Sequence, residues 1–255
     1  MYKWSNEWKR KGFYAILILF CGCCFIGISK KTKETEGEIQ QKESVEESGV
    51  KEKPSIAITF DDGPSSRYTG RLLDGLKERN VKASFFLIGE NAEENPVLVE
   101  RIYKEGHLIG NHTYTHCNLS KLETGEAKKE LEQTDTVITH LSEEAAVREI
   151  EKTDQVISAI TGEHVAYMRP PFGAWQRELE VRMEVLPVLW SVDPLDWTTE
   201  NVDEIVSKVV TEVEEGDIIL LHDCYASSVE AALRIVDILQ KEGYEFVTVD
   251  RLLID

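Results

Sequence analysis

The sequence predicts an α/β fold, a distorted and incompletely closed (β/α) barrel of about seven parallel strands. Short apolar runs alternate with segments of helical period along residues 54–255, which is the pattern of strands joined by helices. Strands that are joined by helices run parallel, because a parallel pair needs a long crossover connection. The strand–helix units are too many for a small open sheet and one short of a full eightfold barrel.

The predicted strands are short apolar runs, and amphipathic stretches of helical length separate them. The strands are expected at Ile56–Phe60, Ala83–Gly89, His107–His112, Val165–Arg169, Val185–Asp193, Asp217–His222 and Glu245–Val249. The helices are expected at Arg67–Arg79, Pro96–Glu105, Val202–Glu214 and Val229–Glu242. The carboxyl ends of parallel strands lie at one rim, so residues that follow these strands should lie close together.

One segment occurs twice. Residues 127–139 (AKKELEQTDTVIT) resemble residues 146–158 (AVREIEKTDQVIS) at an offset of 19 positions. This offset is not a whole number of turns at about 3.6 residues per turn, so one unbroken helix would turn the second apolar stripe away from the first. We therefore expect two helices, broken near His140–Ser142, with Ser142 as N-cap and a structural role outside the barrel. Coincidence of helix-like composition is the alternative.

The N-terminal residues predict export from the cytoplasm. Residues 1–11 are basic, residues 12–28 are almost wholly apolar, and residues 29–53 are polar and charged. This order predicts a cytoplasmic N-terminus, a transmembrane signal-anchor and a disordered linker that leads to a domain at 54–255 outside the cell membrane. A cleaved secretory signal is an alternative, although no Ala-x-Ala-like site follows. A lipid-anchored cysteine is another, because Cys21, Cys23 and Cys24 cluster in the apolar run.

Charge excludes some partners. The chain has a formal net charge of −18 and 42% hydrophobic residues, so it offers no basic face to neutralise the phosphates of nucleic acid or of anionic lipids. A neutral or cationic substrate suits this charge.

Two adjacent carboxylates, Asp61 and Asp62, follow the first predicted strand directly, and Gly63 and Pro64 end that strand. Neighbouring residues on a strand point in opposite directions, so one acid can bind a metal while the other handles a proton. The alternative is a plain turn in which aspartate caps the backbone.

His112 and His116 are four residues apart after the third predicted strand. If the chain turns helical there, the two imidazoles share one face and can hold one metal ion. Thr113 stands where a metalloprotease would have its glutamate base. With Asp62 they form a three-ligand set with open positions, typical of catalytic zinc, although such a histidine pair also arises by chance. Structural roles are expected for His107 and His164, and His140 is expected to be a surface residue.

Three further polar segments each follow a predicted strand: Arg169–Gly173, Asp193–Trp197 and Leu220–Asp223. Together with the segments at Asp61 and His112, and in this order, they resemble the NodB-homology polysaccharide deacetylases, carbohydrate esterase family 4. The resemblance runs from about residue 55 to residue 250. It implies a NodB-like distorted (β/α) barrel and a metal-dependent hydrolase that removes acetyl groups from sugars.

The resemblance also implies roles for single residues of all five segments. These are a general base at Asp61, metal ligands at Asp62, His112 and His116, a base-orienting arginine at Arg169, a pair beside the catalytic acid at Asp196 and Trp197, an acetyl-pocket residue at Leu220 and the general acid at His222.

Elementary chemistry is consistent with these roles. A divalent metal, zinc or else cobalt or another ion, lowers the pKa of bound water towards about 7 and polarises a carbonyl. Asp61 can accept the proton of water, and imidazolium His222 can protonate the departing amine. The backbone N–H of Phe172, which stands where the family commonly has tyrosine, is a candidate oxyanion donor.

Two cysteines are close in sequence to these segments. Cys117 follows His116 directly, and Cys224 lies two residues after His222. In an oxidising compartment they are candidates for a disulfide, and the alternative is two free thiols, one of which could reach the metal. Asp193 and Asp223 are expected to be structural.

These expectations lead to one functional hypothesis and its alternatives. The hypothesis is a membrane-anchored, metal-dependent deacetylase of N-acetylglucosamine residues in a glycan polymer, peptidoglycan first. The alternatives are deacetylation of chitooligosaccharides or acetylxylan, and a carbohydrate-binding pseudoenzyme that kept only the fold.

Overall fold

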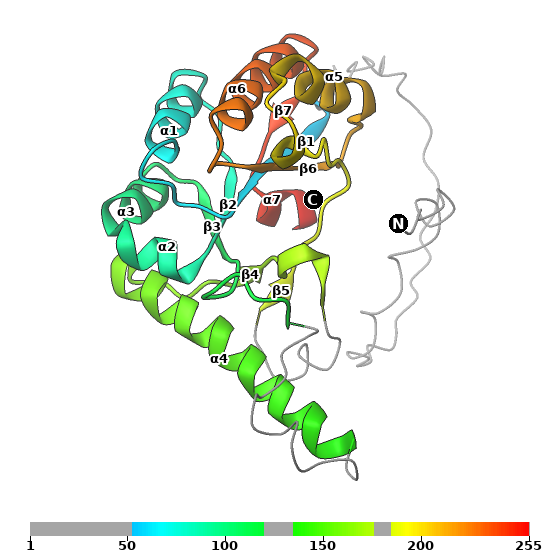
Figure 1. Cartoon of the computed structure of the whole chain (residues 1–255). Helices are drawn as coiled ribbons and strands as arrows, with labels where there is room; N and C mark the ends of the chain where they lie inside the picture. Colours follow the sequence, from blue (N-terminus) through cyan, green and yellow to red (C-terminus); the bar gives the residue numbers. More distant parts are fainter. Residues whose placement is uncertain (1–52, 120–134, 176–184, 255) are drawn as a thin grey trace, which may run out of the picture. The chain divides into compact units, whose positions relative to one another are not determined.

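Seven strands, paired in parallel, form the sheet at the centre of the computed structural model (Figure 1). The structure describes residues 53–119, 135–175 and 185–254, and the count refers to these residues. The strands are β1 (Ser55–Asp61), β2 (Ser84–Leu87), β3 (Leu108–Asn111), β4 (Tyr167–Met168), β5 (Leu186–Pro187), β6 (Ile218–His222) and β7 (Glu245–Phe246). Each lies within, or one residue beyond, a strand that the sequence predicts.

The sheet closes irregularly. Its order is β5-β4-β3-β2-β1-β6, and β7 pairs with the first two residues of β1. After β5 the chain comes back beside β6, where Val192 forms an isolated parallel bridge with Ile219 of β6. The predicted fold, an incompletely closed barrel of parallel strands, is confirmed.

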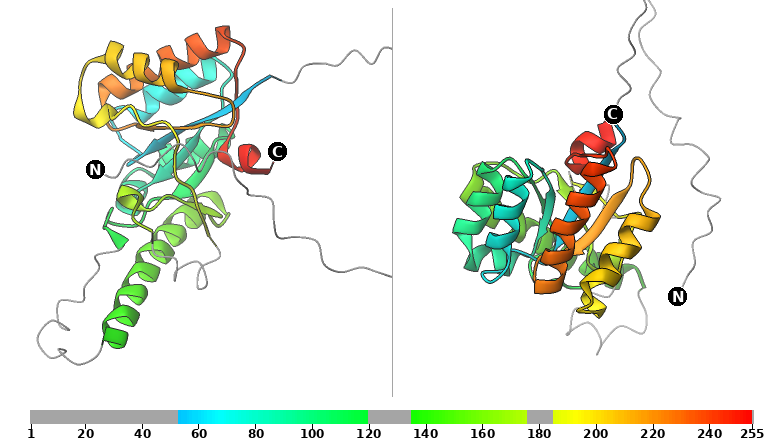
Figure 2. Two further views of the ribbon diagram at one scale, coloured as in Figure 1. Left: turned by 90° about the vertical axis from the view of Figure 1, so that its right-hand side faces the viewer. Right: turned by 90° about the horizontal axis from the view of Figure 1, so that it is seen from above.

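The helices around this sheet are α1 (Thr69–Glu78), α2 (Gly89–Glu94), α3 (Pro96–Lys104), α4 (Asp135–Thr161), α5 (Val202–Glu212), α6 (Ala226–Lys241) and α7 (Val249–Ile254). Helices α1 to α6 lie outside this sheet, and the short α7 packs against the opposite side of β1. Neighbouring contacts run from α5 to α6, then to α1, α3 and α4, and Figure 2 shows α5, α6 and α1 side by side. The sequence missed α2 and α7, and the last predicted strand ends earlier because α7 already begins at Val249.

The predicted break near His140–Ser142 is wrong, because α4 continues through these residues (Figure 1). Its 27 residues contain no glycine or proline to interrupt the helix. The second copy of the repeat lies within α4, whereas residues 127–134 of the first copy lie outside the described residues. The buried residues Ala146, Ile150 and Ile157 recur at helical spacing, so this face packs inward.

The side chains of β1 alternate between two environments. Ile58 and Phe60 pack in the main core under the helices, and Ala57 packs in a second cluster that includes Val249 of α7. Thr59 and Asp61 share the side of Ala57 by strand periodicity, and both accept hydrogen bonds from the guanidinium of one buried arginine. The strand thus delivers a carboxylate to the carboxyl rim of the barrel.

None of the helices in the described part of the chain could cross a membrane. The predicted segment 12–28 lies outside the described residues.

Gly110 of β3 lies at a close approach between strands. A Cβ there would meet the ring of Phe86, with Cε1 at 2.6 Å, and the carbonyl oxygen of Tyr167 at 3.2 Å. We expect Gly110→Ala to lower the free energy of unfolding by about 1–3 kcal/mol, because an aromatic ring and a backbone must move. Chemical denaturation of the purified protein measures this change.

Gly70→Ala in α1 is the matched control, since the nearest atom to its added Cβ is 4.0 Å away. We expect a gain of about 0.5–1 kcal/mol there from the lower entropy of the unfolded chain. Equal effects of the two substitutions would contradict the packing argument.

Candidate active site

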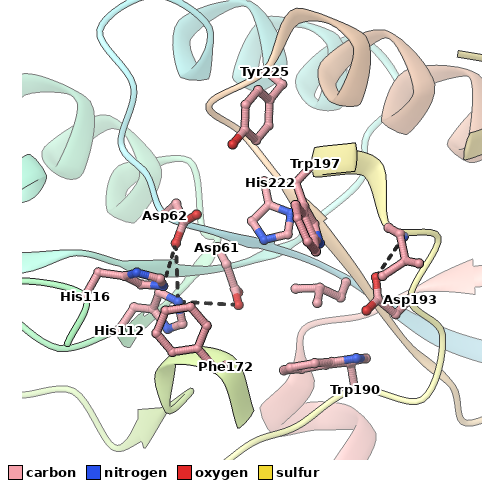
Figure 3. Close-up of a pocket in the computed structure, with 12 residues that line it drawn as sticks. Asp61, Asp62, His112, His116, Phe172, Trp190, Asp193, Trp197, His222 and Tyr225 are labelled. Atoms are coloured by element: carbon pink, nitrogen blue, oxygen red, sulfur yellow. Dashed lines mark hydrogen bonds and ion pairs between the residues drawn. The ribbon is translucent and has the colours of Figure 1, made fainter. Parts of the chain in front are cut away.

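A cavity of about 420 Å³ opens at the carboxyl ends of β1, β3 and β6 (Figure 3). It is lined by Asp61, Asp62, His112, His116, Phe172, Trp190, Asp193, Leu195, Trp197, Leu220, His222 and Tyr225. All site residues that the sequence predicts line this cavity, except Arg169 and Asp196. These two are buried and bond to Asp61 and His222, which do line it.

Both adjacent carboxylates face this one cavity. An extended strand would send Asp62 to the side opposite Asp61. Asp62 instead has a φ of 71°, in the left-handed region, so the chain turns at the strand end. The side-chain amide of Asn91 holds the turn by donating to the carbonyl of Asp62 at 2.8 Å.

Asp62, His112 and His116 form a set that fits a divalent metal. Oδ1 of Asp62 lies 3.4 Å from Nε2 of His112 and 3.3 Å from Nε2 of His116. Two ligands of one tetrahedral ion with bonds of about 2.0–2.1 Å are separated by about the same distance. This Oδ1 is buried and has no hydrogen-bond partner, as expected for an atom that awaits a cation. Nδ1 of His112 bonds to the carbonyl of Arg169 at 2.6 Å, which leaves Nε2 for the metal.

The protonation states of these residues suit metal binding. Burial raises the pKa of Asp62, but the close contact with His112 and the attraction of the nearby imidazoles outweigh burial and lower this pKa from its ordinary value. Burial lowers the pKa of His116 below 6.5, against the attraction of Asp62. An ionised carboxylate and a neutral imidazole are the forms that bind divalent metals.

The two histidines come together through a loop, and the helical turn considered for the chain after β3 is not formed. Left-handed residues at Thr113 (φ 64°) and His116 (φ 56°) turn the chain instead. Glu149 of α4 holds the loop between them: its Oε2 accepts from the backbone N–H of Tyr114 at 3.0 Å. It also accepts from the N–H of Thr115 at 2.8 Å and from its hydroxyl at 3.0 Å.

Sequence reasoning missed Glu149. It lies in the repeated segment, among other acids on a helix, and no local pattern distinguishes it. Asn111 adds a further tie between α4 and the loop. Its amide donates to the carbonyl of Ile150 at 2.8 Å, and its oxygen accepts from the N–H of Thr113 at 2.9 Å.

Arg169 holds Asp61 in a fully buried ion pair. Its guanidinium donates to Oδ1 of Asp61 at 2.8 Å and to the hydroxyl of Thr59 at 2.7 Å. Two more bonds reach the carbonyls of Val188 at 3.1 Å and Leu189 at 3.2 Å. The side-chain exposure is 0% for the arginine and 4% for the aspartate, so the carboxylate is held in one direction.

His222 forms a second pair with Asp196. The imidazole Nδ1 lies 2.8 Å from one carboxylate oxygen, and the backbone N–H of His222 donates to the other at 2.9 Å. Burial lowers the pKa of His222, but Asp196 and the carboxylates Asp61 and Asp62 outweigh it and raise the pKa to about 9. The imidazole is therefore protonated at neutral pH.

Aromatic and apolar side chains form the rest of the cavity. Phe172 is 68% exposed and its ring centroid lies 4.9 Å from that of His116. Trp197 is 56% exposed, whereas Leu220 is buried. The sequence did not single out Trp190 or Tyr225. Their only signal was position: Trp190 lies within the predicted strand Val185–Asp193, and Tyr225 follows His222 by three residues.

The two cysteines near the site, Cys117 and Cys224, are free thiols, which is the alternative to a disulfide between them. Burial raises the pKa of both, to about 12 for Cys224. Neither belongs to the metal-binding set among the described residues, and a protonated thiol is a poor ligand.

Among the other acids and histidines, Asp193 lines the cavity, whereas Asp223 and His107 form buried hydrogen bonds away from it. Asp223 is fully buried behind the site, where Thr69 donates to it and burial raises its pKa to about 7. Asp193 was expected to be structural, but it lines the cavity. Its Oδ1 also accepts a hydrogen bond from the backbone N–H of Leu195 at 2.9 Å. His107 is buried and accepts from the N–H of Ala83 at 3.1 Å.

His164 is on the surface, and its Nδ1 lies 2.6 Å from Oδ2 of Asp154. The side chain of His140 lies outside the described residues.

The arrangement places a cation site and a proton donor on opposite sides of one carboxylate. Figure 3 shows Asp61 between the pair His112 and His116 and the imidazole of His222. Such a site can activate water, accept its proton and protonate a leaving group.

Comparisons with known proteins agree with this chemistry. Residues 48–187 match the family model described as polysaccharide deacetylase. A peptidoglycan-N-acetylglucosamine deacetylase of Bacillus cereus is 36% identical over 208 residues, which cover 79% of this chain and 69% of that protein. A chitooligosaccharide deacetylase of Rhizobium leguminosarum bv. trifolii is 35% identical over 172 residues, 66% of this chain and 71% of that protein.

The peptidoglycan-N-acetylmuramic acid deacetylase PdaC of Bacillus subtilis is 36% identical over 197 residues, 77% of this chain, and the match spans only 38% of PdaC. A solved structure of PdaC superposes with a TM-score of 0.69 at 34% identity, covering 78% of this chain and 90% of that chain.

The bonds of Glu149 lead to a prediction about metal affinity. Glu149→Ala removes three hydrogen bonds from the loop that carries His116. We expect the Kd for Zn²⁺ to rise about 10–100-fold, as for other residues that orient metal ligands. Calorimetric titration of the chelator-stripped protein measures it, with Glu151→Ala on the exposed face of α4 as control. Equal affinities of the two variants would contradict this role.

The pair with Asp196 leads to a prediction about His222. We expect Asp196→Asn to lower the pKa of His222 from about 9 towards 6.5, because the main source of its stabilising charge is lost. The pair contributes fully to the free energy of unfolding below pH 6.5, the ordinary pKa of histidine. This contribution is lost as the pH rises through about 9, the pKa of His222 in the folded protein. NMR titration of the imidazole in chelator-treated protein measures the shift.

Asp154→Asn, which removes the partner of surface His164, is the control and should leave His222 unchanged. A pKa of His222 that stays near 9 in Asp196→Asn would refute the assignment of the shift.

Proposed function

The chain belongs to the polysaccharide deacetylase family, and we propose that it removes N-acetyl groups from N-acetylglucosamine residues of peptidoglycan by metal-dependent hydrolysis. One observation carries the proposal. A cation site, a carboxylate fixed by a buried arginine and a charged imidazole all converge on one cavity.

Asp62, His112 and His116 would hold the metal. When bound there, a divalent ion supplies Lewis acidity, which lowers the pKa of water and polarises a carbonyl. Two imidazoles and one carboxylate suit zinc, and cobalt or another divalent ion is compatible with the same ligands.

Asp61 acts as the general base in this proposal. It lies 3.7 Å from Nε2 of His112, so its free oxygen Oδ2 faces the cation site. Oδ1 accepts a hydrogen bond from the guanidinium of Arg169, which holds the carboxylate in position. The base therefore accepts a proton from water beside the cation site without changing its position.

His222 acts as the general acid. An amine is a good leaving group only when it is protonated, and the charged imidazole supplies that proton. Asp196 orients the ring and stabilises its charge. The backbone N–H of Phe172 assists the oxyanion, Leu220 provides the apolar wall for the acetyl methyl group, and Trp197 flanks the acid.

The substrate follows from the relatives and from the predicted topology. The Bacillus cereus relative is a peptidoglycan-N-acetylglucosamine deacetylase. The basic and apolar N-terminal segments support a single-pass membrane anchor with the domain outside, where the cell wall lies. The chitooligosaccharide deacetylase relative supports the alternative of chitooligosaccharides. The complete catalytic set argues against a pseudoenzyme, which has no need of it.

Acetate release tests the proposal. We expect the protein to release acetate from peptidoglycan faster than from chitopentaose or acetylated xylan, and EDTA to abolish release because the cation site is emptied. Readdition of Zn²⁺ or Co²⁺ should restore it. Asp61→Asn should keep its metal but lose about 10²–10⁴-fold in kcat, since the proton acceptor is gone.

Release that persists in EDTA would overturn the metal-dependent mechanism. The matched variant Asp154→Asn, on the surface, should keep full activity. Faster release from chitopentaose than from peptidoglycan would reject the proposed polymer but keep the reaction.

A further inference from the structure

The catalytic cavity contains one carboxylate to which the mechanism assigns no role. Asp193 lines the cavity, and its Oδ1 accepts a hydrogen bond from the backbone N–H of Leu195 at 2.9 Å. Among the described residues, no group donates to its second oxygen, Oδ2. The residue is only half-buried, so this oxygen is available to a ligand in the cavity.

The geometry of an amide determines where its acyl chain lies in this cavity. The carbonyl carbon is planar, with the oxygen, the nitrogen and the acyl carbon in three different directions. In the proposed reaction the oxygen faces the cation site and the nitrogen faces His222, so the acyl carbon points away from both. Figure 3 shows Asp193 and Trp190 on the opposite side of Asp61 from His112 and His116.

Strand β6 sets the apolar wall for the acyl group beside Asp193. Leu220 and His222 are two residues apart on β6, so their side chains share the side of the strand that faces the cavity. The backbone N–H of Leu220 donates to the carbonyl of Val192 at 2.9 Å, and Val192 directly precedes Asp193. The wall for an acetyl methyl group therefore continues into a carboxylate.

Trp190 adds a second apolar surface. The centroid of its ring lies 5.6 Å from the guanidinium carbon of Arg169, the residue that holds Asp61. Trp190 and Leu220 suit a methyl group, but the carboxylate of Asp193 beside them needs a hydrogen-bond donor, which a methyl group lacks. A hydroxyl on the acyl carbon can donate to that carboxylate.

We propose that the enzyme also removes N-glycolyl (2-hydroxyacetyl) groups from amino sugars of a glycan, and that Asp193 accepts the hydrogen bond of the glycolyl hydroxyl. The inference rests on the proposed function and extends its substrate class from acetyl to hydroxyacetyl amides. Water adds to the carbonyl carbon as its proton goes to Asp61, and the C–N bond breaks as His222 gives a proton to the nitrogen. The products are glycolate and a glycan amine.

Three acyl groups on one oligosaccharide test this inference in the wild-type protein. Chitotetraose carrying N-acetyl, N-glycolyl or N-propionyl groups is the substrate, and kcat/KM is measured from the release of acetate, glycolate or propionate. Glycolyl and propionyl have the same number of non-hydrogen atoms and differ only by a hydroxyl in place of a methyl group. We expect kcat/KM to be about tenfold higher for glycolyl than for propionyl, the effect of one hydrogen bond to a charged group.

Asp193→Asn removes the acceptor with little change of shape. The amide oxygen can still accept from the N–H of Leu195, whereas the NH₂ group that replaces Oδ2 cannot accept a hydrogen bond. We expect the ratio of kcat/KM for glycolyl to that for propionyl to fall about tenfold in this variant. The intrinsic reactivities of the two amides are the same for both proteins, so the change in the ratio isolates the hydrogen bond.

Asp203→Asn is the matched control, since Asp203 is an exposed residue of α5 outside the cavity. It should keep the wild-type ratio. Equal ratios in the wild-type protein and Asp193→Asn would overturn the inference, as would equal kcat/KM for glycolyl and propionyl in the wild-type protein, a comparison that needs no variant. Either result, with acetate still released, leaves the proposed function intact. If the wild-type protein releases no acid from any glycan, the proposed function fails and this inference fails with it.

Discussion

The rest of the site depends on one buried ion pair, between Arg169 and Asp61. The two residues lie 108 positions apart, and both are almost inaccessible to water. Removing charges from water is costly, so such a pair persists only when every polar group finds a partner. Here Thr59, Val188 and Leu189 accept the remaining bonds of the guanidinium. The arginine thereby ties β1 to the chain beyond β4 and β5.

The same arginine links the ion pair to the cation site. Its backbone carbonyl bonds to Nδ1 of His112, so the segment that fixes the base also fixes the orientation of a metal ligand. On the two sides of the cavity, the electrostatic surroundings of His116 and His222 differ. Burial lowers the pKa of His116, while carboxylates raise that of His222. Two imidazoles in one cavity thus take opposite forms, one neutral for a cation and one charged to donate a proton.

Much of this could be predicted because the signals are local. Each strand is a short apolar run, and the residue after it must lie at the carboxyl rim, so Asp61, His112 and His222 were placed correctly from the chain alone. Glu149 and Tyr225 could not be found, since their importance arises from contacts with distant segments. The backbone conformation between His112 and His116 could not be predicted either, because the spacing of two ligands does not reveal the backbone between them.

Backbone conformation explains why those loops resist prediction. Among the described residues, six that are not glycine have positive φ, and all but Asn80 line the cavity or its metal loop: Asp62, Thr113, His116, Phe172 and Leu195. A side chain in this region costs about 1–3 kcal/mol where it is strained, so surrounding bonds must impose it. Asn91 and Glu149 supply such bonds at Asp62 and at the loop between the histidines. The barrel core therefore stabilises a rim that would not adopt this shape alone, and helix α4 contributes to the site although none of its described side chains lines the cavity.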